Sequence, residues 1–228
     1  MVKDYYEVRA IFKKTDRAIY ISHLDLMRVM QRTFKRAKLP VWFTKGFNPH
    51  AYINFSLPLS LGVSSECEVM DFAVDMSSGL PDYEHLTVEM NKALPQGLEI
   101  VKMYAPVKSH TVIGSCDYTL KFMTDTPAEE VESAFVAFLS QPEILVEKRA
   151  KVNMKKTLVT VDIKPDIKVK GKRAGEYFEV DLHLPAGIKH TLNVVAVSTA
   201  FETYFGKEFD KICLKRTKIY DSDGRDFI

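Results

Sequence analysis

The side chains best suited to chemistry lie together between Ser22 and Asp71. The stretch from Leu26 to Ser65 contains no Asp or Glu. Its basic residues are Arg28, Arg32, Lys35, Arg36, Lys38 and Lys45, and the aromatic and imidazole rings beside them are Trp42, Phe43, Phe47, His50, Tyr52 and Phe55. Cations meet phosphates, and aromatic rings stack on bases. The stretch therefore predicts a surface for an anionic polymer such as RNA.

A helix must position the first group of cations. Ser22 is placed as its N-cap with Asp25 three residues later, and Pro40 ends it. Met27, Met30, Phe34 and Ala37 form an apolar stripe, and the candidate RNA contacts Arg28, Arg32, Lys35 and Arg36 fall on another face. The alternative is an ordinary solvated face. No acid stands four residues after these cations, which favours the binding hypothesis.

The segment Lys45-Gly46-Phe47-Asn48-Pro49-His50 predicts a turn with a second group of contacts. We expect Lys45 to bind phosphate, Phe47 to stack on a base, and Asn48 and His50 to donate hydrogen bonds. The alternative is a hairpin turn with Phe47 in the core. Trp42 and Phe43 are expected to be core residues.

His23 and His50 are the candidate catalytic residues, because imidazole exchanges protons near neutral pH. The alternative for His23 is structural, with Asp25 capping the helix and His23 packing beside it. Neither histidine belongs to a recognisable catalytic motif. We therefore favour a non-catalytic role and keep catalysis by these histidines as an alternative.

A second basic window runs from residue 148 to 173 and contains ten basic residues. Its candidate RNA contacts are Lys168, Lys170, Lys172 and Arg173. One hypothesis is a flexible basic hairpin that clamps RNA, and the other is a solvated loop.

No cofactor or metal site is predicted. Cys67, Cys116 and Cys213 are far apart, whereas an iron–sulfur cluster needs closely spaced thiolates. Glu66, Glu68 and Asp71 could hold a metal, but alternation on a strand explains them equally well. The N-terminus lacks a long apolar run, which predicts a cytoplasmic protein without membrane contact.

Hydrophobic periodicity predicts an α+β protein made of tandem ferredoxin-like (βαββαβ) halves with antiparallel sheets. The first half spans 1–105, with helices over 22–40 and 82–94. Strands are expected over 6–12, 18–21, 41–43, 53–57, 68–74 and 98–104, with a turn over 15–17 and a loop over 61–66. The second spans 116–220. Its helices open at Thr126 and cover 192–205, with Gly206 as the C-cap of the latter, and strands are expected over 118–122, 145–148, 158–163, 178–184 and 212–219. A polar linker joins the halves, and residues 221–228 are expected to be a frayed tail.

The ordered motifs ISHLDLMR, RAKLP, KGFNPH, FSLPLSLGVSSECEVMD and ALPQGLEI resemble the radical-SAM-linked (radical-SAM-associated) bacterial protein family of unknown function. The resemblance covers about the first 105 residues closely and the rest, including LKRTKIY, more loosely. It implies work on RNA or ribosomes beside a radical-SAM protein. At fold level the chain also resembles the repeat-associated RNA-binding superfamily that includes CRISPR repeat-processing endoribonucleases.

The leading hypothesis is a non-catalytic RNA-binding accessory protein that acts with a radical-SAM partner on RNA or ribosomes. One alternative is a metal-independent endoribonuclease of the repeat-associated type, using His23 or His50. The other is a protein-docking subunit without RNA contact.

Overall fold

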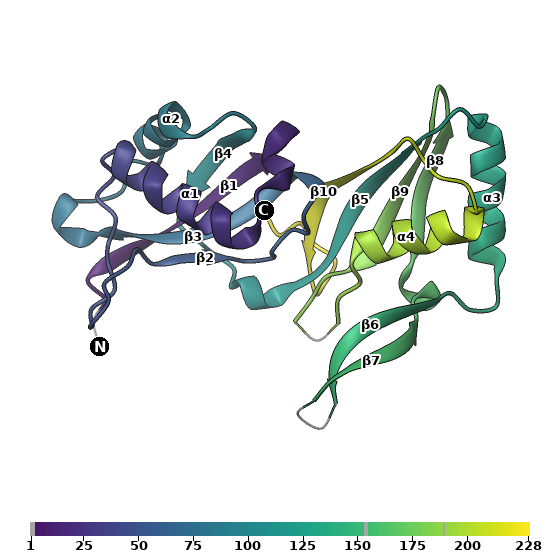
Figure 1. Ribbon diagram of the computed structural model, residues 1–228. Coiled ribbons are helices and arrows are strands. Elements are labelled where there is room, and N and C mark those ends of the chain that lie inside the picture. Colours follow the sequence, from purple (N-terminus) through teal and green to yellow (C-terminus); the bar gives the residue numbers. More distant parts are fainter. Residues whose placement is uncertain (1–2, 153–154, 189) are drawn as a thin grey trace. The chain divides into compact units, whose positions relative to one another are not determined.

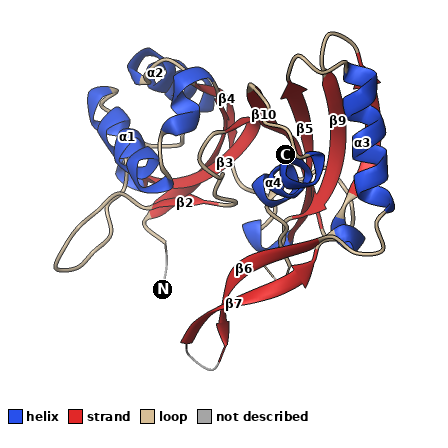
Figure 2. Cartoon of the chain, turned by 45° about the vertical axis from the view of Figure 1, so that its right-hand side comes forward, coloured by secondary structure: helices blue, strands red, loops and turns tan. Residues whose placement is uncertain are grey.

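The computed structural model describes residues 3–152, 155–188 and 190–228, except for the side chains of 149–156 (Figure 1). The chain divides into two compact units, Met1–Ile113 with Arg225–Ile228, and Gly114–Gly224. The fold is α+β, and the described residues contain four α-helices (Figure 2). No helix among them has both the length and the apolar character needed to span a membrane.

The N-terminal unit is built on four strands, β1 (Tyr5–Lys14), β2 (Ile53–Phe55), β3 (Val63–Asp75) and β4 (Leu98–Tyr104). They lie in the order β4-β1-β3-β2, and every neighbouring pair is antiparallel. Because side chains alternate along a strand, one face of this sheet is apolar and the other carries polar residues.

Two helices, α1 (His23–Arg36) and α2 (Tyr83–Ala93), lie on the apolar face of this sheet (Figure 1). The predicted N-cap of α1 is confirmed, since the Ser22 side chain accepts a hydrogen bond from the Asp25 backbone N–H. The core that the helices close is made of Val8, Ala10, Phe12, Leu26, Met30, Phe34, Met70, Phe72, Leu86 and Met90.

Apart from a hairpin described below, the C-terminal unit has four strands among the described residues, β5 (Ile113–Met123), β8 (Lys168–Ala174), β9 (Phe178–Pro185) and β10 (Lys211–Asp221). Their order is β10-β5-β9-β8, and β9 is antiparallel to both β5 and β8. The β8 edge strand is one that the sequence did not predict.

The helices of this unit, α3 (Ala128–Ser140) and α4 (Val194–Phe205), pack against each other and against the sheet. Phenylalanine rings fill the space between the helices and the sheet. The ring centre of Phe201 lies 5.0 Å from that of Phe122 and 4.9 Å from that of Phe135, and both pairs meet edge to face. The predicted C-cap of α4 is confirmed, because Gly206 has a left-handed φ of 70°.

A separate hairpin, β6 (Leu145–Val152) and β7 (Lys155–Asp162), stands between α3 and β8 along the chain (Figure 2). Strands around 145–148 and 158–163 were predicted, and the structure pairs them in a sheet of their own. The Asp162 carboxylate accepts hydrogen bonds from the backbone N–H groups of Ile144 and Lys164, which closes the base of the hairpin.

Several local predictions are wrong. Residues Asp16–Tyr20 form a 3₁₀ helix, where a turn followed by a strand from Ala18 was expected. The segment 41–43 makes only isolated bridges, Val41 to Val74 and Phe43 to Ala51. Ser64 to Glu66 belong to strand β3 instead of a loop. Helix α3 begins one residue later than predicted, so that Pro127 and not Thr126 is its N-cap.

The predicted frayed tail is also wrong. Phe227 is buried, and its ring lies 4.9 Å from the Arg9 guanidinium. Lys108 Nζ donates a hydrogen bond of 2.8 Å to the carbonyl of Asp226. The last four residues therefore belong to the N-terminal unit.

Candidate nucleic-acid interface

Helix α1 presents cations on its outer face because its apolar residues point into the core. Leu26, Met30 and Phe34 are buried. The four predicted contacts on this helix, Arg28, Arg32, Lys35 and Arg36, are all exposed. The predicted separation of an apolar stripe from a basic face is therefore confirmed.

Two of these cations are already engaged within the N-terminal unit. Arg28 pairs at 2.8 Å with Asp25, an acid that stands three residues before it and not four residues after it. Arg36 donates a 2.7 Å hydrogen bond to the carbonyl of Ala93. Within the part of the chain that the structure describes, Arg32, Lys35 and Lys38 make no ion pair. These three are the cations best placed to meet a ligand.

The loop between Thr44 and His50 is held closed at its base. The Thr44 backbone N–H donates to the carbonyl of His50, and Thr44 Oγ1 lies 3.1 Å from His50 Nδ1. His50 Nδ1 also lies 3.1 Å from the carbonyl of Asn48. Lys45 pairs with Asp4, which raises the pKa of Lys45 and keeps this amine charged but engaged.

Phe47 stands at the tip of this loop with its side chain fully exposed. The alternative that placed Phe47 in the core is therefore wrong. Phe43 is also 45% exposed, contrary to its expected burial. Trp42 is half-buried, with its ring 4.6 Å from that of Tyr5. Phe43 and Phe47 therefore both present ring surface to the solvent.

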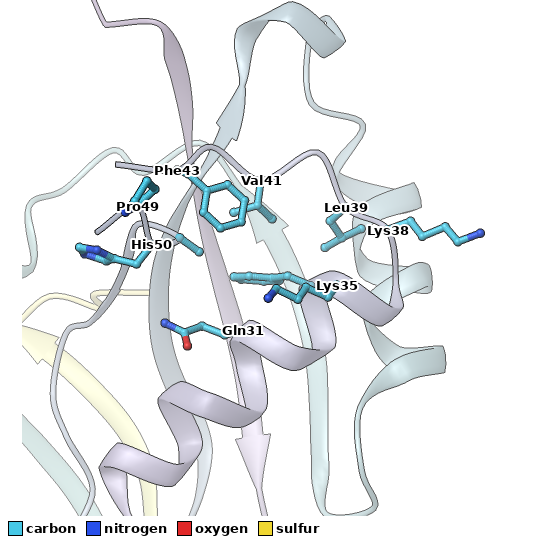
Figure 3. Close-up of a pocket in the computed structure, with 10 residues that line it drawn as sticks. Gln31, Lys35, Lys38, Leu39, Val41, Phe43, Pro49 and His50 are labelled. Atoms are coloured by element: carbon cyan, nitrogen blue, oxygen red, sulfur yellow. The ribbon is translucent and has the colours of Figure 1, made fainter. Parts of the chain in front are cut away.

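A pocket of about 380 Å³ lies between α1 and this loop. Gln31 and Lys35 reach it from the helix, and Phe43, Pro49 and His50 line it from the loop side (Figure 3). Phe34 and Val41 supply apolar wall, and the Lys38 side chain extends outward at its rim. The pocket thus combines aromatic surface, one amide and two cations.

The pocket brings together only some of the predicted residues. Lys35 and His50 line it, whereas Arg28, Lys45 and Phe47 do not. Gln31 and Phe43 line it but were not predicted as contacts. Gln31 stands four residues before Lys35, so helical spacing could have identified it. The position of Phe43 depends on the fold of the loop and gave no local signal.

His23 lies apart from this pocket, at the first turn of α1. Its ring packs edge-on against Phe55, with 5.3 Å between ring centres. This contact supports the structural alternative for His23 over a catalytic one.

The four predicted contacts of the second basic window lie in strand β8: Lys168, Lys170, Lys172 and Arg173. Residues 148–152 and 155–162 of the same window belong to the hairpin β6–β7. Lys170 pairs with Asp117 at 2.6 Å, Lys172 with Glu132 at 2.9 Å, and Arg173 with Asp181 at 2.6 Å. Of these four, only Lys168 has no ion pair with a described residue. The part of the window at 149–156 lies outside the described side chains.

The three cysteines are thiols; Cys67 and Cys116 are buried, and Cys213 is partly buried. Among the described residues, no three or more His, Cys, Asp or Glu side chains are grouped so that they could hold a metal ion. Asp71, one of the three acids considered as ligands, is paired with Arg9.

Comparison with known proteins gives 24 matching chains among solved structures, and a family. A chain in the solved structure "Crystal Structure of a Cbf5-Nop10-Gar1 Complex" is 13% identical, with a TM-score of 0.44 over 94% of this chain and 49% of that one. This chain therefore spans about half of the length of that chain. No curated protein matches the sequence. The family model "Uncharacterized protein conserved in bacteria (DUF2344)" matches residues 7–196, and the chain belongs to this family.

Proposed function

We propose that this protein binds single-stranded RNA through the outer face of α1 and the loop 44–50. The observation that carries the proposal is the fully exposed Phe47 ring on a loop whose pocket is flanked by Lys35 and Lys38. A single exposed ring is ordinary on a protein surface. An exposed ring and cations without ion pairs in the same unit are the groups that stack a base and meet its phosphates.

The pocket supports a single strand over a duplex. Bases of a single strand can leave the stack and enter a cavity, whereas bases in an RNA helix lie in a groove that side chains do not enter. A volume of about 380 Å³ is within the range of pockets that hold small ring-shaped ligands. The Gln31 amide offers both a donor and an acceptor to the edge of a base.

We propose that the remaining predicted contacts bind the parts of the RNA that lie outside the pocket. Asn48 and Lys45 lie on the loop, and Arg28 and Arg36 on α1, so these four extend the surface around the pocket. In the C-terminal unit, Lys168 is the member of the basic strand best suited to a phosphate, since its three neighbours in the set are paired.

We further propose that the protein acts as an accessory to a radical-SAM partner on RNA or ribosomes. The support is the ordered set of motifs from ISHLDLMR to ALPQGLEI. These motifs span α1, the loop and the pocket, so the partner and the RNA would use the same unit. Binding of a radical-SAM protein without any RNA would favour a docking subunit instead.

We also propose that the two units are tandem ferredoxin-like halves. Their strand orders are β4-β1-β3-β2 and β10-β5-β9-β8. Counted along the chain within each half, with the hairpin β6–β7 left out, both orders are fourth, first, third and second strand. The hairpin β6–β7 is then an insertion between the first helix and the second strand of the C-terminal half.

The test is RNA affinity against salt concentration, measured by fluorescence anisotropy with a labelled single strand. The variant Arg32→Glu, Lys35→Glu, Lys38→Glu reverses the cations without ion pairs. The control Arg17→Glu, Lys92→Glu, Lys102→Glu makes the same charge change at other exposed positions of the unit. We expect the salt slope to fall by about 0.7 for each phosphate that the first variant no longer binds, and to stay unchanged in the control. Equal affinity and slope in both variants would contradict the proposed surface.

A further inference from the structure

Four polar side chains from four neighbouring strands of the C-terminal unit form one hydrogen-bonded network. Asp117 on β5 is at its centre. One of its oxygens, Oδ1, lies 2.7 Å from Nδ1 of His183 on β9. The other, Oδ2, accepts from the Tyr220 hydroxyl on β10 at 2.7 Å and from Lys170 Nζ on β8 at 2.6 Å. Both carboxylate oxygens are thereby fixed.

The network determines the protonation of Asp117. Only 13% of this side chain is exposed, and burial by itself would raise the pKa of Asp117. The hydrogen bonds from Lys170, Tyr220 and His183 outweigh burial and hold the pKa below the ordinary value of 3.8. Asp117 is therefore an ionised carboxylate at neutral pH.

An ionised carboxylate can only accept hydrogen bonds, so the His183 nitrogen that faces it must carry a proton. That nitrogen is Nδ1. In the neutral imidazole the other nitrogen, Nε2, then holds the free electron pair. This is the arrangement of a histidine prepared to remove a proton from a ligand.

His183 borders a pocket of about 380 Å³ in the same unit. Lys168 lines this pocket too and stands directly opposite His183 in the pairing of β8 with β9. The pocket also contains Ser115, Asp221 and Asp166, and the last of these is held at 2.7 Å by His190 Nε2. A base and a cation are therefore adjacent at one cavity.

We propose that His183 is a general base that acts on an RNA strand, with Lys168 meeting the phosphate beside the reacting hydroxyl. The proposal rests on the RNA binding proposed above and goes beyond a non-catalytic role. RNA is the polyanion that places a hydroxyl, the ribose 2′-OH, next to every phosphodiester. A base beside a cation matches that pair of groups.

The step is an internal transesterification. His183 Nε2 takes the proton of the 2′-hydroxyl, the 2′-oxygen bonds to the adjacent phosphorus, and the bond from phosphorus to the 5′-oxygen breaks. The departing oxygen takes a proton from water, and the imidazolium returns its proton to the solvent. The products are a 2′,3′-cyclic phosphate and a free 5′-hydroxyl, with no change of oxidation state.

Lys170 and Tyr220 are positioning residues in this arrangement. They donate to Oδ2 of Asp117, the oxygen that does not face His183, and Asp117 in turn orients the imidazole. Sequence reasoning considered Lys170 only as an RNA contact, and His183 not at all.

The experiment uses the full chain and a 5′-labelled single-stranded RNA in EDTA, between pH 5 and pH 9. We expect wild type to cleave the RNA to a cyclic-phosphate end, and a strand with 2′-deoxy sugars to stay intact. His183→Ala should lose at least about 100-fold in rate. His85→Ala, an exposed histidine of the other unit, should cleave like wild type.

The outcomes separate this site from the RNA-binding surface. Wild type that binds RNA but does not cleave it, or a His183→Ala variant that cleaves at the wild-type rate, would overturn the site and leave the proposed binding function intact. Failure to bind any RNA would overturn both. His183 would also be excluded as the base if the variant Arg32→Glu, Lys35→Glu, Lys38→Glu lost cleavage while His183→Ala remained fully active.

A second measurement does not depend on activity. Nitrogen-15 NMR of the imidazoles at neutral pH should show His183 protonated at Nδ1 in wild type. Asp117→Asn should change that tautomer and lower the cleavage rate without changing RNA affinity, and Lys170→Met should do so to a smaller extent. A wild-type His183 protonated at Nε2 instead would overturn the proposal.

Discussion

Arg9 and Asp71 are register partners on β1 and β3 and are joined by two parallel hydrogen bonds, from Nε to Oδ1 at 2.7 Å and from Nη2 to Oδ2 at 2.8 Å. Their side chains are only 2% and 11% exposed. Arg9 Nη1 also donates to the carbonyl of Lys108, and the ring of Phe227 covers the guanidinium. One arginine thus holds both the segment after β4 and the C-terminal tail.

Removing one partner of this pair should be far more costly than removing both. Asp71→Ala leaves the Arg9 charge buried without its counterion, so we expect the free energy of unfolding to fall by about 3–5 kcal/mol. The double variant Arg9→Met, Asp71→Leu should lose less than Asp71→Ala alone. Urea denaturation measures all of these values. A loss of unfolding free energy in the double variant that equals the sum of the losses from removing each partner alone would show that the two side chains act independently.

Gly97 is required where the chain turns into β4. It has a φ of 86°, and a Cβ there would lie 2.5 Å from the carbonyl oxygen of Thr15. Gly79 has almost the same φ, 87°, but no atom within 4 Å of its Cβ position. Gly79→Ala should cost about 1–2 kcal/mol of unfolding free energy, from backbone strain. Gly97→Ala should cost about 1–3 kcal/mol more, from the clash. Equal losses in urea denaturation would be evidence against this clash.

Elements with local signals could be predicted from the sequence. Helix α1 was, because the Ser22 cap and the spacing of Met30 and Phe34 lie within one segment. Strand β8 was not, because its residues show no apolar alternation and it exists through pairing with β9. Charged residues are common on edge strands, where they discourage pairing with other chains. In this strand, the charges that suggested a loop are those expected at a sheet edge.

Among the residues of the candidate sites, too, those with a local signal could be predicted and those that depend on distant contacts could not. Lys35 was predicted from helical spacing, but the loop that faces it depends on contacts across the fold. Asp117 and His183 are separated by 66 positions and meet only through the register of β5 with β9. Alternation predicted β5 and β9 as strands. It gives no register, so it could not show that these two side chains are partners.

The Asp117 network should make the C-terminal unit sensitive to acid. The folded-state pKa of Asp117 lies below 3.8, so its contribution to stability is present above that value and is lost as pH falls through the lower, folded pKa. Asp117→Asn should therefore lower the free energy of unfolding by about 1.5–3 kcal/mol at pH 6. The difference from wild type should shrink towards pH 2. A difference that stays constant over this range in urea denaturation would exclude the ionised network as its source.

Phe47 should matter for RNA and not for folding. Its ring is fully exposed, so Phe47→Ala should leave the melting temperature unchanged. Loss of one stacked base should weaken RNA binding by about 1–3 kcal/mol. Phe47→Tyr should retain the affinity, and Phe47→Leu should lose most of it, because a leucine is apolar but has no ring face. The salt slope should stay as in wild type in all three variants, since no charge is removed. Anisotropy titrations at several salt concentrations would measure both quantities. An affinity in Phe47→Leu equal to that of wild type would mean that Phe47 contributes apolar contact alone, without stacking.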